Sequence, residues 1–155
     1  MAKRGVSDVI EQISVFLENK TGRLAELCRA LGNAGINMRA LMVADTEEFG
    51  VVRIICDHPG KARETLEAAG FGVSTTPVVA VEIPDTAGGL ADVLEALGAQ
   101  HMNVEYAYCF VGPSGGAAVD VFKVDHAGAG EMLSSRGYRV LKPSDLYAGD
   151  ASESV

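Results

Sequence analysis

The chain has 155 residues, of which 48% are hydrophobic and 22% are charged, a mixture typical of a globular protein with a packed core. Its net charge is −8, and such a field repels nucleic-acid phosphates and anionic membrane surfaces, so we expect neither as a partner. The sequence lacks the roughly 18 consecutive apolar residues of a membrane span and the apolar region of a secretory signal.

The first predicted elements are a strand and an amphipathic helix. Residues 13–17 alternate between apolar and polar side chains, as a half-buried strand does. Apolar side chains then recur at helical spacing, at Leu24, Leu27, Cys28 and Leu31. Gly32 and Gly35 are predicted to close this helix, because glycine readily adopts the left-handed conformation of a helix end.

A hairpin, a second helix and a last strand are predicted to follow. Residues 36–45 and 50–56 are typical of two strands joined by the polar turn 46–48. The second helix is predicted to open near Asp57-His58-Pro59, where aspartate is a good cap and proline suits the first turn. Gly70 is predicted to end this helix, and a short strand is expected near residues 73–75.

The second half of the chain repeats this series. Residues 79–104 match residues 13–38 without a gap, and eight of the 26 positions are identical. A strand and a helix are predicted there, with Gly98 helping to close the helix. Strands are then predicted at 102–111 and 117–124, joined by the glycine-rich turn 112–116. A last helix opens at Asp125-His126 and ends at Gly137, before a strand near 139–141.

This order, β-α-β-β-α-β in each copy, predicts an α+β protein of two tandem ferredoxin-like units, with antiparallel sheets and helices on one face. The expected domains are residues 1–76 and 77–147, followed by a flexible tail at 148–155. The three cysteines, Cys28, Cys56 and Cys109, each lie in an apolar pattern. This pattern and their odd number fit buried, reduced thiols, so we expect a cytoplasmic protein.

The turn after the first strand of each copy carries the chemistry of a binding site. Asn19 and Asp85 each stand three residues before a glycine, Gly22 or Gly88. A helix start offers free N–H groups to a carboxylate, and a short side-chain oxygen can accept from an ammonium group. Free N–H groups beside a side-chain oxygen match the carboxylate and the ammonium group of a free α-amino acid. Alternatively, Asn19 and Asp85 cap their helices and the glycines satisfy turn geometry.

The order of these elements, with the [N/D]-x-x-G-x-L turn and Gly35-Ile36-Asn37-Met38, resembles an ACT domain, an amino-acid-binding regulatory module. The second copy resembles another, although His101 replaces the glycine at 35. The resemblance implies edge-to-edge pairing of sheets, a homodimer, and ligands at the interface between units. It implies these ligand-binding residues: Asn19, Thr21, Gly22, Arg23, Leu24, Asn37, Met38, Asp85, Thr86, Gly88, Gly89, Leu90, Asn103 and Val104.

Other chemistry has weak support in the sequence. No histidine or cysteine pair has metal-ligand spacing, and no catalytic motif is present, so we expect no metal, no cofactor and no enzymatic activity. Alternation places three aromatic residues on one face of a strand: Tyr106, Tyr108 and Phe110. These rings would either line a pocket or belong to the core or to an interface. Two functions remain: a sensor that regulates an enzyme or transporter, and an interaction or assembly module that binds no ligand.

Overall fold

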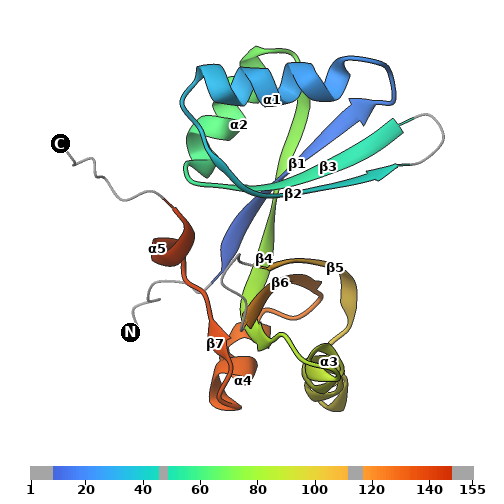
Figure 1. Ribbon diagram of the computed structural model, residues 1–155, viewed down its shortest axis with the longest axis vertical. Coiled ribbons are helices and arrows are strands. Elements are labelled where there is room, and N and C mark those ends of the chain that lie inside the picture. The colour runs from blue at the N-terminus through green and yellow to red at the C-terminus, as the bar shows by residue number, and fades with distance from the viewer. Residues whose placement is uncertain (1–8, 46–48, 112–116, 148–155) are drawn as a thin grey trace. The chain divides into compact units, whose positions relative to one another are not determined.

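The computed structural model describes residues 9–45, 49–111 and 117–147, and the chain divides into two compact units between Thr76 and Pro77 (Figure 1). Of these residues, the N-terminal unit contains Glu11–Thr76 with Leu146 and Tyr147, and the C-terminal unit contains Val9, Ile10 and Pro77–Asp145. The Arg39 Nε donates to the Leu146 carbonyl at 3.0 Å, which ties that residue to the first repeat. The predicted tail, 148–155, lies outside the described residues.

The N-terminal unit has the predicted order of elements. They are β1 (Ile10–Glu18), α1 (Arg23–Asn33), β2 (Met38–Asp45), β3 (Phe49–Cys56), α2 (Pro59–Ala68) and the first part of β4 (Gly72–Pro84). The strand order is β2-β3-β1-β4, and β3 runs antiparallel to both β1 and β2. Figure 1 shows α1 and α2 on the same side of this sheet.

The core of the N-terminal unit lies between that sheet face and the two helices. The alternation predicted for β1 buries Ile13, Val15 and Leu17, and α1 buries Leu27 and Leu31 against them. Each such side chain contributes about 1.5–3 kcal/mol through its burial. This packing holds α1, and with it the turn between β1 and α1, against the sheet.

The C-terminal unit repeats this arrangement. Its elements are the rest of β4, α3 (Gly89–Ala99), β5 (Val104–Val111), β6 (Ala117–Val124), α4 (Ala129–Ser135), β7 (Arg139–Val140) and α5 (Pro143–Leu146). The last residue of α5, Leu146, belongs to the N-terminal unit. The strands β4, β6 and β5 follow one another, and β7 pairs with β4. The predicted α+β fold with two ferredoxin-like units is confirmed. Two predicted strands, near 73–75 and 79–83, form the single strand β4, since proline and its preceding residue both favour extended backbone.

Four helices end on a residue with left-handed backbone. Three of these residues are glycines, and the fourth is His101, with φ of 58° at the position of Gly35. The next residue donates back to the helix in both copies, Ile36 to the Leu31 carbonyl and Met102 to the Leu97 carbonyl, each at 3.0 Å. Histidine tolerates this conformation better than most residues. The prediction that Gly32 and Gly98 close their helices was wrong, because both lie within α1 and α3.

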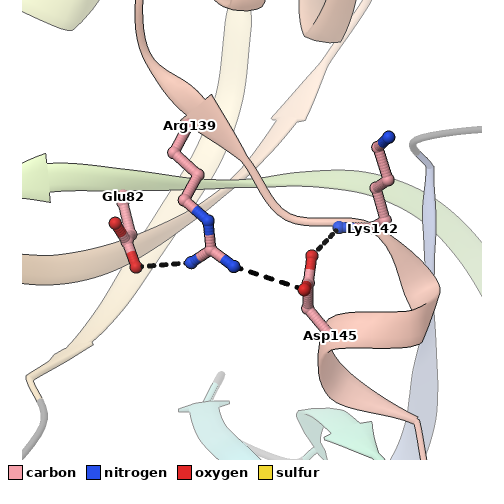
Figure 2. A network of polar contacts seen from close by, with 4 residues as sticks. All are labelled: Glu82, Arg139, Lys142 and Asp145. Atoms are coloured by element: carbon pink, nitrogen blue, oxygen red, sulfur yellow. Dashed lines mark hydrogen bonds and ion pairs between the residues drawn. The ribbon is translucent and has the colours of Figure 1, made fainter.

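A polar network at the surface of the C-terminal unit joins β4, β7 and α5 (Figure 2). Arg139 Nη1 contacts Glu82 Oε2 at 2.7 Å, and its Nη2 contacts Asp145 Oδ1 at 3.3 Å. The other Asp145 oxygen accepts from the Lys142 N–H at 2.7 Å. Exposed ion pairs contribute about 0–1 kcal/mol each, so the network positions α5 more than it stabilises the unit.

Candidate ligand-binding site

The turns between β1 and α1 and between β4 and α3 have the same backbone. In the first turn, the Lys20 N–H donates to the Glu18 carbonyl at 2.8 Å, and the Arg23 N–H donates to the Lys20 carbonyl at 3.2 Å. In the second, Thr86 N–H donates to the Pro84 carbonyl at 2.8 Å, and Gly89 N–H to the Thr86 carbonyl at 3.1 Å. The duplication therefore preserves a defined turn geometry as well as a sequence pattern.

Gly22 and Gly88 occupy the N-cap positions of α1 and α3 with φ of 90° and 87°. Neither helix has a side-chain cap among the described residues, so capping by Asn19 or Asp85 is not observed. A Cβ built on either glycine would meet nothing within 4 Å. The glycines are thus required by the backbone conformation, and the space above each helix start is open.

This conformation sets the expected effect of substitutions at Gly22. Valine should destabilise the N-terminal unit by about 1–2 kcal/mol, because a β-branched residue is strained in the left-handed region. Asparagine tolerates that region, so Gly22→Asn should cost less than Gly22→Val while placing a side chain in the open space. Urea unfolding measures both, with Gly60→Asn, another glycine with open space around it, as a control. Equal stability of Gly22→Val and Gly22→Asn would contradict the conclusion that the left-handed backbone requires glycine at this position.

A cavity of about 110 Å³ lies beside the first turn. It brings together two residues of the predicted site with residues of β1, β2 and β3: Leu17, Glu18, Asn19, Lys20, Leu24, Val43 and Gly50. Its lining combines apolar residues with Asn19 and the charged residues Glu18 and Lys20, which suits a small molecule that is both polar and apolar. Thr21 is exposed in the same turn.

The basic side chains near the first turn are engaged by acidic neighbours. Lys20 Nζ and Arg23 Nε each lie 3.6 Å from a Glu18 carboxylate oxygen. Arg23 also pairs with Glu26, and its guanidinium stacks over the Phe71 ring at 4.6 Å from the centroid. Arg23 is therefore held by these three side chains, which lowers its availability to a ligand.

The predicted residues at the start of the second strand lie at the other end of each sheet. Asp45, the last residue of β2, pairs with Gly50, which pairs with Leu17 at the end of β1. Met38 is about seven residues away along β2, or roughly 20 Å at the rise of a strand. Asn37 and Met38 therefore do not meet the turn of their own unit, and the same register separates Asn103 and Val104 from theirs. A site built from both parts needs a second unit.

The strands β2 and β5 are sheet edges, and β2 exposes large apolar side chains. Each has one neighbouring strand among the described residues, β3 and β6 respectively. Leu41 and Val43 of β2 are 43% and 47% exposed, and Leu24, Leu90 and Leu94 are also exposed on α1 and α3. Apolar edge strands of this kind are natural sites for pairing with another chain.

A family model described as an ACT domain pair matches residues 8–146. The chain belongs to the ACT domain family. Protein BT0572 from Bacteroides thetaiotaomicron is 37% identical over 91% of this chain and 97% of its own, with a TM-score of 0.86. The ligand-free regulatory subunit of aspartate kinase from Thermus thermophilus is 19% identical over 86% of this chain and 98% of its own, with a TM-score of 0.60.

The regulatory subunit of aspartate kinase from Thermus flavus is 17% identical over 82% of this chain and 90% of its own, with a TM-score of 0.56. At these identities the two aspartate kinase subunits show a shared fold. A search of curated protein sequences finds no match. The chain is thus an ACT domain pair that shares its fold with regulatory subunits.

The aspartate before the second helix of each ACT unit hydrogen-bonds to a residue earlier in the chain and does not cap that helix. The Asn37 N–H donates to Asp57 Oδ1 at 3.0 Å, and the Asp57 N–H donates to the Asn37 carbonyl at 3.1 Å. Asn103 and Asp125 make the same two bonds, at 2.9 and 3.0 Å. The prediction that these aspartates cap was wrong, since no side chain caps α2 or α4. They hold the start of the second strand instead.

The C-terminal ACT unit differs from the first at its turn. Gly89 is buried, and a Cβ there would lie 2.5 Å from the Pro84 carbonyl oxygen, so its role in the fold is steric. Thr86 and Asp85 are exposed. Tyr106, Tyr108 and Phe110 are partly buried and pair with residues of β6 that face away from the helices. These rings therefore do not line the turn.

The prediction that Cys109 is buried was wrong, because it is exposed on the edge strand β5. Sequence reasoning also missed the pairing of Cys109 with Asp120 across β5 and β6. By register they occupy the positions of Val43 and Val52 in the first unit, because Val52 and Asp120 face the equivalent residues Val15 and Val81. Burial raises the pKa of the Asp120 carboxyl, and a hydrogen bond from the Cys109 thiol opposes part of that rise. Burial and the Asp120 carboxylate also raise the pKa of Cys109.

Residues 9–45, 49–111 and 117–147 hold no group of three or more histidine, cysteine or acidic side chains arranged to bind a metal ion. In the same part of the chain, no helix has the length and apolar character that crossing a membrane requires.

Proposed function

We propose that this ACT domain pair binds a free α-amino acid at its glycine turns and regulates a partner enzyme or transporter, with no catalysis of its own. The observation that carries the proposal is the uncapped helix start at Gly22, which opens beside a cavity lined by Asn19. The free N–H groups of α1 suit the ligand carboxylate, and the Asn19 oxygen suits its ammonium group. Asp85 and Gly88 take the places of Asn19 and Gly22 in the second unit.

The proposed site is completed by a second unit in a homodimer. Asn37 and Met38, and likewise Asn103 and Val104, lie too far from the turn of their own unit to share a ligand with it. Antiparallel pairing of edge strands places the start of one strand beside the end of its neighbour. The proposal therefore assigns the turn residues and these second-strand residues to opposite sides of one ligand.

The proposed protein has two domains and is located in the cytoplasm. We keep residues 1–76 and 77–147 as the two domains. The cysteines among the described residues, Cys28, Cys56 and Cys109, are free thiols, which supports a reducing compartment such as the cytoplasm. A ligand that binds between units regulates by favouring one arrangement of them, with coupling of about 1–3 kcal/mol.

Calorimetric titration with each of the twenty amino acids tests this function. We expect at least one to bind, and backbone amide NMR shifts at Gly22, Leu24, Gly88 or Leu90 to identify the turn involved. The second candidate, an assembly module, is favoured by the apolar edge strand β2 with Leu41 and Val43. That alternative predicts no heat and no shift at either turn with any amino acid, a result that would reject the sensor.

A further inference from the structure

The charges around the two turns differ. In the first unit, Glu18 and Glu26 balance Lys20 and Arg23. The equivalent residues of the second unit are Pro84, Asp92, Thr86 and Gly89, which include one acid and no base. Asp85 replaces the neutral Asn19 and adds a second acid. The second turn itself therefore carries acids without a base, whereas the first is balanced, and Arg136 at the end of α4 lines cavities with Pro84 and with Asp92.

A buried carboxyl group adds to this difference. Asp120 is 5% exposed and stands at the register position of Val52, which is fully buried in the first unit. Its cross-strand neighbour is Cys109, and no lysine or arginine of the described residues forms an ion pair with it. A carboxyl group that replaces a core valine and lacks a cationic partner is costly to keep.

Asp120 is the cross-strand neighbour of a residue whose counterpart in the first unit lies at the proposed ligand position. Val43, the counterpart of its neighbour Cys109, lines the cavity beside the first turn. Cys109 is exposed on the edge strand β5, on the sheet face that carries Asp120, and the Asp85 charge raises the pKa of its thiol. A ligand seated at the second turn as at the first would therefore meet Cys109, the cross-strand neighbour of Asp120.

We propose that the site of the C-terminal unit takes an α-amino acid with a cationic side chain, and that Asp120 and Asp85 determine this specificity. The inference rests on the proposed function. A guanidinium or ammonium group would give Asp120 and Asp85 the ion pair that neither forms with the described residues. Hydrogen bonds between charged groups are stronger than neutral ones. The first site, with Val43 and Val52 at the same positions, lacks this preference.

Titration of the full chain with L-arginine and L-citrulline tests the specificity, because the two differ mainly in the charge of the side-chain end. Amide shifts of Gly88 and Leu90 report the second site, and those of Gly22 and Leu24 report the first. We expect L-arginine to bind at the second site at least tenfold more tightly than L-citrulline. Asp120→Asn should reduce that preference severalfold, and Glu131→Gln, which removes an exposed acid from α4, should leave it unchanged.

The outcomes separate the inference from the function on which it rests. Equal binding of L-arginine and L-citrulline at the second site overturns the cationic specificity, and so does binding of neutral amino acids alone, although amino-acid sensing stands in both cases. A preference that survives Asp120→Asn unchanged removes Asp120 from the assignment. If no amino acid shifts either turn, the proposed function itself fails.

Discussion

Replacing Asp120 by valine is expected to raise the free energy of unfolding of the C-terminal unit by about 2–3 kcal/mol at pH 8. The first unit shows that valine fits this register position, because Val52 is fully buried there between β1 and β2. The substitution adds buried apolar surface and removes a carboxyl group that must lose its hydration to fold. Urea unfolding measures the change, with Glu131→Gln as a control for loss of one negative charge.

The gain from Asp120→Val should depend on pH. Burial raises the pKa of Asp120 in the folded state, so the folded unit favours the protonated carboxyl. Stability from this preference is fully present below the unfolded pKa of about 4 and is lost as pH rises through the folded pKa. The advantage of valine should therefore be smallest below pH 4 and larger at pH 8. A less stable variant at pH 8 would contradict this account.

Asp120→Val is also expected to separate stability from binding. If the carboxyl serves a cationic ligand, the variant gains stability and loses its preference for L-arginine. Trade-offs of this kind are common where a binding site keeps a polar group that the core alone would not select. Measuring unfolding and binding on one variant therefore tests whether Asp120 is kept for the ligand.

Introducing lysine at both Leu41 and Val43 is expected to convert the proposed homodimer to a monomer and to weaken amino-acid binding. Both side chains lie on the edge strand β2 and are about half exposed within the unit, so the unit itself should fold. In a symmetric interface each substitution occurs twice, and unpaired or like charges there cost several kcal/mol. The dimer dissociation constant should rise by at least about 100-fold.

Sedimentation of the wild type and of Leu41→Lys/Val43→Lys measures this effect. Phe16→Lys is a matched control, since Phe16 is 59% exposed on β1, which is not an edge strand. A wild type that sediments as a monomer at micromolar concentration would contradict the homodimer. A variant that remains dimeric would place the interface elsewhere.

Periodicity and the internal repeat were enough to predict most of this fold. Alternation in β1 and helical spacing in α1 predicted their buried faces, because burial follows directly from side-chain direction. The repeat also located both glycine turns. Periodicity did not predict that β4 runs through Pro77 as one strand, nor the short helix α5, since neither has a distinct apolar period.

The unpredicted parts of the candidate site depend on pairing between distant residues. Cys109 and Asp120 become neighbours only through the register of β5 and β6, which a sequence read along one strand does not reveal. Asp57 has the composition of a helix cap, but it bonds to Asn37, 20 residues earlier in the chain. A glycine turn is local, and so its position could be recognised without knowledge of the fold.

The left-handed glycine at each helix start separates two tasks within a few residues. Gly22 and Gly88 keep the same backbone although the residues on either side differ in size and charge, as Lys20 and Arg23 do from Thr86 and Gly89. Substitutions beside the glycine can thus alter which side chain a ligand must carry, while the amides that would hold its common carboxylate stay in place. A duplicated gene with this design can acquire a second chemical preference without rebuilding its first.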